Sequence, residues 1–396
     1  MKTKIRRSQL LVIGCFFGFF LFCLVRGLAQ PDRPSSAAEN RSLAQRPAMR
    51  RVVTDFGGFA RDFESYAADQ FPDREQFIGV YTALELAQGK KFARMAYCLQ
   101  GGWLLTKPTP TKPADLSALQ QALTQAGALD RPLVWCVLPL KNEALYDLEP
   151  AYFSDETGKT NKQALTAALA QVEGLTVIDA EAPLVTGTLA DRERYFYKTD
   201  FHWNARGAFA AAQEIARQLA GTGTIAETSV PQAEDFLWSE LGGERRYQGD
   251  LNVWFSNQFS MQEDIPRYVP KNAADLRYFL HPGDIESVPR ETIVGSGLDK
   301  DPVTYNDVFT YNLGYYRVEN PDAPEAASVL ILKDSFQNAT IDYLSAIFRS
   351  VTVVDPRSYQ ETPDLASLLD ADGIDLVLFF YHQNNVSREL IDFLSA

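Results

Sequence analysis

Histidine and cysteine are scarce in this sequence, which limits the metal and redox chemistry that it can support. Three histidines and four cysteines occur in 396 residues. Cys15 and Cys23 lie in an apolar N-terminal run, so only Cys98 and Cys136 remain for the rest of the chain. Their spacing indicates no zinc cluster. We expect these two thiols to be buried and free, with a disulfide between them as the alternative.

Positive charge is also in deficit. Lys and Arg together number 38 against 51 Asp and Glu, which gives a formal net charge of -13 at pH 7. This charge argues against a nucleic-acid partner and does not favour adhesion to anionic lipid. A neutral or cationic substrate is favoured instead. The chain is long enough for one large domain, or for one domain with a large insertion.

The N-terminus has the pattern of a targeting segment, because basic residues precede an uncharged run from Ser8 to Val25. Residues 1–29 are predicted to be an uncleaved signal anchor or, as the alternative, a signal peptide that is cut after Ala29. In either case the remainder lies outside the cytoplasmic membrane. Residues 30–54 are rich in Pro, Ser, Ala, Gln and Arg and are predicted to be a tether.

From residue 55 to residue 396 the apolar pattern predicts an α/β domain. Helical spacing alternates with continuous apolar strands, which is typical of a mostly parallel sheet covered on both faces. The stretch from about 225 to 325 breaks this alternation, is rich in aromatic residues, and is predicted to be a strand-rich insertion that partly lines a groove. The predicted helices span 55–88 with a break at Pro72, 115–126, 161–170, 338–348, 363–369 and 387–394, and the strands span 133–138, 175–178, 329–332, 351–354 and 376–380.

One of the three histidines stands two residues after an aspartate. In an extended segment, Asp200 and His202 point to the same side, so the carboxylate can fix the tautomer of the imidazole and make it a general base. Asn204 is a good N-cap for the helical run that follows and ends at Gly221. Two alternatives remain open. Asp200 can simply brace a turn while His202 packs beside Trp203, or the pair can bind a metal ion.

A serine in a suitable position for a nucleophile follows a predicted buried strand. Ser335 stands at the carboxyl end of that strand and directly before a predicted helix, the edge at which open parallel sheets bind ligands. Free backbone N–H groups at a helix start can receive a developing oxyanion. The alternative is that Ser335 is an ordinary helix cap.

Taken together, these motifs resemble the bacterial DHHW proteins, which are similar to the serine-nucleophile domains of alginate O-acetylation proteins. That group is a rearranged branch of the SGNH hydrolases in which Asp-x-His precedes the serine. The sequence departs from the pattern at Phe201, which replaces the first histidine of the DHHW motif, and at Lys333, where SGNH enzymes have glycine. The resemblance rests on Phe63 to Arg74, Gly102-Trp103-Leu104, Leu138-Pro139, Asp200-Phe201-His202-Trp203, Lys333-Asp334-Ser335-Phe336 with Asn338, and Asp355-Pro356-Arg357.

The resemblance implies an SGNH-hydrolase-like three-layer α/β sandwich in which Ser335 is the nucleophile, His202 the base and Asp200 its orienting carboxylate. The backbone N–H of Ser335 is the first candidate to bind the oxyanion. Further candidates for oxyanion or substrate contact are Asn338, Gly249, Tyr381, Asn384 and Trp203.

The expected activity is serine-dependent transfer of an acyl group, in particular acetyl, to hydroxyls of a cell-surface or secreted polysaccharide. A membrane-bound O-acyltransferase is the expected donor partner, and no cofactor or nucleic acid is expected. Two alternatives are open: a carbohydrate esterase that uses the same residues with water as acceptor, and a non-catalytic protein that binds glycan or acts as a scaffold.

Overall fold

The computed structural model describes residues 7–36, 41–93, 96–127, 129–148, 156–241, 245–359 and 365–395. The chain forms two compact units: Met1–Lys90 with Val253–Gln258, and Lys91–Asn252 with Phe259–Ala396. The sequence placed the start of the α/β domain at residue 55. In the structure, the helices between residues 55 and 90 group with the N-terminal unit instead.

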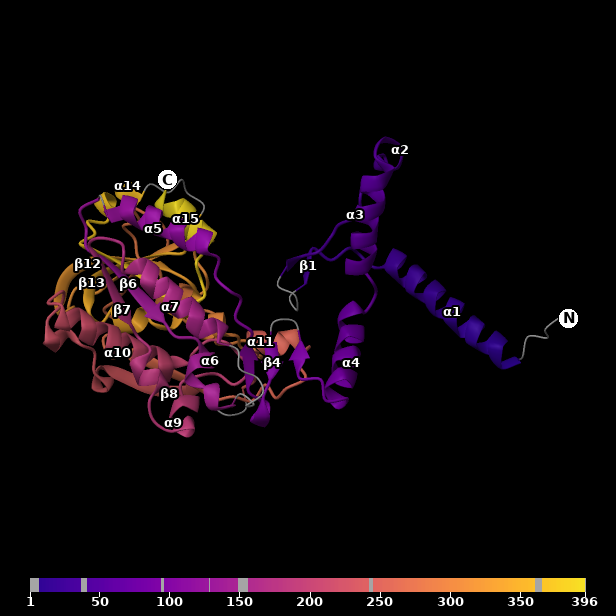
Figure 1. Cartoon of the computed structure of the whole chain (residues 1–396), viewed down its shortest axis with the longest axis horizontal. Coiled ribbons are helices and arrows are strands. Elements are labelled where there is room, and N and C mark those ends of the chain that lie inside the picture. Colours follow the sequence, from indigo (N-terminus) through magenta and orange to yellow (C-terminus); the bar gives the residue numbers. More distant parts are fainter. Residues whose placement is uncertain are drawn as a thin grey trace. The chain divides into compact units, whose positions relative to one another are not determined.

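The first unit begins with helix α1 (Figure 1), which spans Arg7–Ala29. Its segment Ser8–Gly27 has a mean hydropathy of 2.3 and is long and apolar enough to cross a membrane. The predicted break at Pro72 is confirmed, since one helix ends before this proline and the next begins after it. The other elements of this unit are β1 (Ser35–Ser36), β2 (Arg41–Ser42), α2 (Arg51–Thr54), α3 (Phe56–Asp69) and α4 (Arg74–Ala87).

The second unit is built on a seven-stranded sheet of order β10-β11-β13-β12-β14-β6-β7. The last five strands of this order are mutually parallel, as predicted. Strand β11 pairs antiparallel with both β10 and β13, and β10 and β11 come from the predicted insertion, which therefore extends the edge of the sheet. The strands are β6 (Leu133–Leu138), β7 (Leu175–Asp179), β10 (Arg277–Phe279), β11 (Tyr315–Glu319), β12 (Glu325–Lys333), β13 (Phe348–Val354) and β14 (Leu376–His382).

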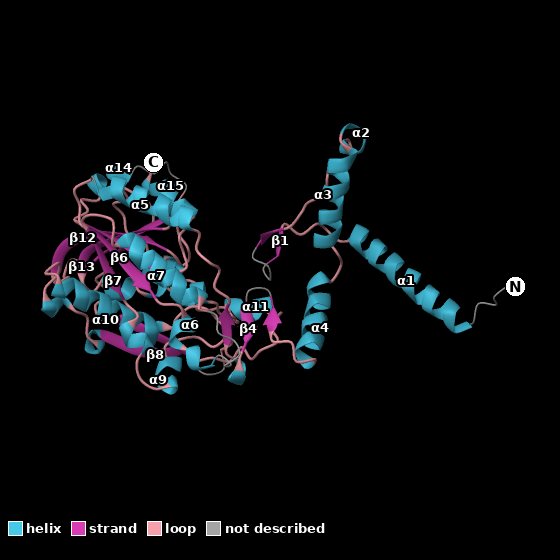
Figure 2. Ribbon diagram, viewed as in Figure 1, coloured by secondary structure: helices cyan, strands magenta, loops and turns pink. Residues whose placement is uncertain are grey.

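Two apolar cores cover the two faces of this sheet, so the fold is a three-layer α/β sandwich (Figure 2). Alternate residues of each strand enter opposite cores, as the pleat requires. On β14, for example, Phe380 enters the core that contains Trp203 and Phe336, whereas Phe379 and Tyr381 enter the other. The helices α5 (Pro113–Gly127), α7 (Thr157–Leu169), α14 (Leu365–Ala371) and α15 (Arg388–Leu394) pack on one face, and α8 (Ala182–Val185), α10 (Ala205–Gly221) and α13 (Ile341–Leu344) on the other.

The predicted helix 338–348 is wrong. The chain forms a 3-10 helix η6, Ser335–Ala339, and then the single turn α13, because β13 already begins at Phe348. The Thr340 hydroxyl also bonds back to the carbonyl of Gln337 at 2.9 Å, which closes the first turn. The expected start of the 363–369 helix lies outside the described residues, and the described part begins at Leu365.

Smaller elements complete the second unit and lie mostly around the predicted insertion and the Asp200 loop. They are β3 (Phe92–Ala93), β4 (Ala96–Cys98), β5 (Leu104–Thr106), α6 (Lys141–Ala144), α9 (Leu189–Glu193), β8 (Phe236–Leu241), β9 (Ile265–Pro270), α12 (Tyr305–Val308) and the first residues of α11 (Asp250–Trp254), whose last two residues group with the first unit. Most aromatic side chains of the insertion, including Tyr247, Tyr278, Tyr305 and Tyr316, are buried in the core. The sequence predicted that the insertion partly lines a groove, but these buried rings do not line an open one. Cys98 and Cys136 are both free thiols, as expected, and Cys98 is only half-buried.

Candidate active site

The structure brings Asp200, His202 and Ser335 into one hydrogen-bonded row. His202 Nδ1 lies 2.7 Å from Asp200 Oδ1, and His202 Nε2 lies 2.8 Å from Ser335 Oγ. The serine and the histidine are 133 residues apart in the sequence. A nucleophile, a base and a carboxylate in hydrogen-bond contact are the arrangement that nucleophilic serine chemistry needs.

The serine is free to act because its neighbour performs the capping role. Asp334 is the N-cap of η6, and its Oδ1 accepts the Phe336 N–H at 2.9 Å. Its Oδ2 accepts the backbone N–H of His382 at 2.8 Å and the side-chain amide of Asn385 at 3.1 Å. The Ser335 hydroxyl, which is partly exposed, points to His202 instead.

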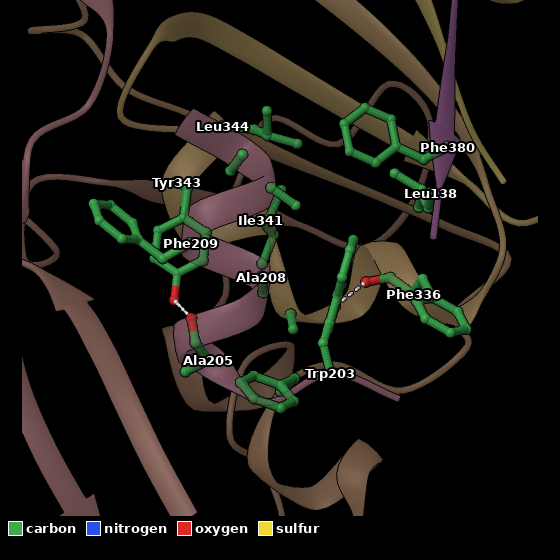
Figure 3. Packing of buried hydrophobic residues seen from close by; sticks show 14 of the residues in the cluster. Leu138, Trp203, Ala205, Ala208, Phe209, Phe336, Ile341, Tyr343, Leu344 and Phe380 are labelled. Carbon is green, nitrogen blue, oxygen red and sulfur yellow. Dashed lines mark hydrogen bonds between the residues drawn. The ribbon is translucent and has the colours of Figure 1, made fainter. Parts of the chain in front are cut away.

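Trp203 positions the nucleophile turn and does not contact solvent. Its Nε1–H donates to the carbonyl oxygen of Phe336 at 3.0 Å, and the two rings meet edge to face with centroids 5.3 Å apart (Figure 3). The indole is completely buried. The sequence placed Trp203 among the substrate contacts, whereas the structure gives it a packing and anchoring role.

A second aromatic side chain fixes the plane of the imidazole. The ring of Tyr305 stacks on that of His202 with centroids 3.9 Å apart and an angle of 5°. The Tyr305 hydroxyl donates to the same Phe336 carbonyl at 3.3 Å. The nucleophile turn and the histidine are therefore joined by a layer of buried rings as well as by the hydroxyl contact.

Asp200 has no exposed surface, and every oxygen of its carboxylate is hydrogen-bonded. Oδ1 accepts from the backbone N–H and ring of His202, while Oδ2 accepts from the Tyr247 hydroxyl and the Asp250 backbone N–H, both at 3.0 Å. Burial alone would raise the pKa of the Asp200 carboxyl, but His202 and these donors outweigh it and the pKa is lowered. The carboxylate is thus held ionised.

The backbone around Asp200 is hydrogen-bonded by two ionisable side chains, Lys141 and Glu263. The Lys141 ammonium is buried and donates to the carbonyls of Leu104, Lys198 and Asp200 at 2.7, 3.0 and 2.8 Å. On the other side, Glu263 accepts the backbone N–H groups of Lys198 and Thr199. Burial lowers the pKa of Lys141 to about 7, against the charges of Glu263 and Asp200.

The sequence did not single out any of the residues that hold Asp200 and His202 in place. Lys141 stands two residues after the Leu138-Pro139 motif, and a lysine this close to the end of an apolar strand was the one available signal. Tyr247, Glu263 and Tyr305 belong to the insertion, where no periodic pattern marks them.

Besides Trp203, four residues were candidates for oxyanion or substrate contact: Asn338, Gly249, Tyr381 and Asn384. Each of them contacts other parts of the protein. The side-chain amide of Asn338 donates to Asn306 and Asn312. Gly249 packs against Thr199, where a Cβ would lie 2.3 Å from the carbonyl oxygen. Tyr381 stacks on Trp135 in the core on the other face of the sheet.

Asn384, the fourth of these candidates, accepts from Asn161 at 2.8 Å through its side-chain oxygen. The backbone N–H of Ser335 belongs to the nucleophile itself. Among the described residues it donates to no protein acceptor. It is therefore available to a ligand at the nucleophile.

The metal alternative also has a geometric basis. Atoms of Asp200, His202 and Asp250 lie within 4.8 Å of one another. However, His202 uses one ring nitrogen for Asp200 and the other for Ser335. A metal ligand needs a free lone pair on nitrogen, so the observed contacts favour a proton relay over a metal site.

Comparison with known proteins agrees with this fold. Residues 103–275 match the family model described as the SGNH hydrolase-like domain of acetyltransferase AlgX, a range that includes Asp200 and His202 and ends before Ser335. No curated protein matches the sequence. The chain therefore has an SGNH-hydrolase-like α/β fold, and the expected resemblance to this group is confirmed by the family match over residues 103–275 and by the fold shared with a DHHW family protein.

Two solved structures illustrate the shared fold. Bacillus cereus PatB1, determined with a sulfonyl adduct, is 22% identical with a TM-score of 0.64, over 76% of this chain and 99% of that chain. A DHHW family protein from Eubacterium siraeum is 17% identical with a TM-score of 0.57, over 76% of this chain and 94% of that chain.

The contribution of the Lys141 hydrogen bonds to the stability of the Asp200 loop can be tested by Lys141→Met. This change removes a donor from three backbone carbonyls, of which that of Lys198 still accepts the Leu104 N–H at 3.0 Å. It should destabilise the protein by about 2–4 kcal/mol, since each buried unpaired group costs about 1–3 kcal/mol and the apolar side chain recovers part of this. Urea unfolding measures the loss. Lys198→Met is the matched control, because both ammonium groups approach the Trp103 ring, that of Lys141 at 5.1 Å and that of Lys198 at 5.8 Å, but Lys198 is exposed. Equal stability of the two variants would contradict the assigned role.

Proposed function

We propose that this protein transfers an acyl group, in particular acetyl, to hydroxyls of a polysaccharide outside the cytoplasmic membrane, through a covalent intermediate on Ser335. The observation that carries the proposal is the row Asp200, His202 and Ser335, with contacts of 2.7 and 2.8 Å. The match of residues 103–275 to a domain described as an acetyltransferase supports the choice of acyl group.

In the first half-reaction, Ser335 Oγ attacks the carbonyl carbon of a donor ester while His202 Nε2 takes its proton. Asp200 stabilises the resulting imidazolium, which then returns the proton to the leaving oxygen. In the second half-reaction a sugar hydroxyl attacks the acyl-enzyme and gives its proton to the same nitrogen; the bond between the acyl carbon and Ser335 Oγ then breaks, and His202 returns the proton to Oγ. The Ser335 backbone N–H lies at the nucleophile and can stabilise the oxyanion in both steps.

We further propose that the donor is a membrane-bound O-acyltransferase and the acceptor a cell-surface or secreted glycan. Water as acceptor would make the same residues a carbohydrate esterase. Product analysis separates the two: acyl transfer yields an acylated oligosaccharide, whereas hydrolysis yields the free acid at a rate independent of the oligosaccharide.

The proposed catalytic unit predicts a specific pattern of losses. Ser335→Ala and His202→Ala should each lower kcat on an acetyl ester by at least about 10³-fold, and the double variant should be little worse, because the members of one unit are not additive. Asp200→Asn should have a similar or milder effect. Labelling by phenylmethylsulfonyl fluoride, read by mass spectrometry, should occur at Ser335 and be lost in both single variants.

Ser387→Ala is the matched control for the capping alternative. Ser387 is the N-cap of α15 and accepts the Leu390 N–H at 3.1 Å. Its loss should cost about 0.5–2 kcal/mol of stability and leave kcat unchanged. If Ser335→Ala behaved in the same way, with full activity in the folded fraction, the proposed function would be wrong.

For localisation we propose that α1 remains as a single-pass membrane anchor. Apolar burial rather than charge holds a spanning helix in the bilayer, so the protein should sediment with membranes and resist washing with high salt. Fractionation followed by N-terminal sequencing measures this. A secreted form that begins at Gln30 would show that residues 1–29 are a cleaved signal peptide.

A further inference from the structure

We propose that His382 is a second oxyanion donor, whose Nε2–H binds the acyl carbonyl oxygen as negative charge develops on it. This inference rests on the proposed function and adds a catalytic residue to it. Neither the motifs nor the comparisons assign any role to His382.

His382 lies beside the nucleophile because two neighbouring strands end together. The register of β12 and β14 pairs Lys333 with Phe380. One step further, the Asp334 N–H donates to the Phe380 carbonyl at 3.0 Å and the His382 N–H donates to the Asp334 carboxylate at 2.8 Å. His382 is thus hydrogen-bonded through its backbone to Asp334, the residue that immediately precedes Ser335.

The side chain of His382 approaches the same aromatic ring as the proposed base. The Phe336 ring lies 5.0 Å from the imidazole of His202 and 5.2 Å from that of His382, measured between centroids. Both imidazoles therefore adjoin the residue that immediately follows Ser335. In addition, 21% of the His382 side chain is exposed, so a ligand can reach it.

Hydrogen bonding defines which nitrogen of His382 carries the proton. The Asn384 backbone N–H donates to Nδ1 at 3.2 Å, so Nδ1 presents its lone pair and the neutral ring has its proton on Nε2. Burial lowers the pKa of His382, against the charge of Asp334, which favours the neutral ring. The Asp334 carboxylate is 3.9 Å from Nε2, too far for a hydrogen bond. The Nε2–H is therefore a neutral donor available to a ligand.

The chemistry needs such a donor. When Ser335 Oγ bonds to the carbonyl carbon, the electron pair of the C=O double bond moves to oxygen and the serine proton moves to His202. The Ser335 backbone N–H and the His382 Nε2–H then share the oxyanion. When the double bond re-forms, the alkoxide leaves with the proton from His202. His382 donates a hydrogen bond throughout and transfers no proton.

The decisive comparison is His382→Gln against His382→Met, because the two side chains have similar length and only glutamine can donate. We expect His382→Met to lower the acylation rate with p-nitrophenyl acetate by about 10²–10³-fold, the usual loss for one oxyanion donor, with KM within about threefold. His382→Gln should be at least about tenfold faster than His382→Met. Equal acylation rates of the two variants would overturn the proposal, as would a His382→Met rate within about threefold of the parent.

Further measurements distinguish the role of His382 from the proposed function and from a loss of stability. His281→Met, at the exposed third histidine, should retain the parental rate, and thermal melting of the Met and Gln variants should show similar stability. If Ser335→Ala abolishes acylation while His382→Met does not change it, only the role of His382 fails. If Ser335→Ala remains fully active, the proposed function itself fails and His382 loses its role with it.

Discussion

The arrangement of the candidate site depends on keeping a buried carboxylate ionised at Asp200. A charge without exposed surface is costly unless hydrogen bonds replace the lost water, and removal of a single donor leaves that cost uncompensated. Here His202, Tyr247 and the Asp250 amide supply the replacement. Because the carboxylate cannot move without losing these contacts, the imidazole that it orients is fixed as well. Pre-organisation of this kind avoids reorganisation when charge develops during the reaction.

The aromatic-rich insertion supports this arrangement more than it shapes an open surface. Tyr247 and Asp250 bind the Asp200 carboxylate, Glu263 holds the preceding backbone, and Tyr305 stacks on His202. The same stretch extends the sheet edge with β10 and β11. A segment that looks like an interruption of the α/β pattern is therefore part of the framework of the site. This structural role also explains why so many aromatic rings of the insertion are buried.

Two adjacent residues divide two tasks that a single serine cannot perform together. An N-cap side chain must turn back to a backbone N–H, whereas a nucleophile must point to its base. Asp334 takes the cap and, through its second oxygen, also binds the end of β14. Ser335 is left with a hydroxyl for His202 and a backbone N–H that no described protein group accepts. The site is thus assembled at the shared end of two neighbouring parallel strands.

The sequence by itself determined the α/β class, the strand 133–138 to the residue and the break at Pro72, because each depends on local periodicity or proline geometry. For Asp200, His202 and Ser335 the short motifs supplied candidates and left a packing or capping role open. Only the tertiary structure decided what surrounds them. Lys141 and Glu263 act on the Asp200 loop from distant parts of the chain, and Tyr381 was lost as a candidate because the pleat turns it to the opposite face. Helix 338–348 failed for a similar reason, since pairing of β13 in the sheet overrode local helical spacing. Motifs identify residues that share a short segment, whereas burial, strand register and long-range hydrogen bonds exist only after the chain has folded.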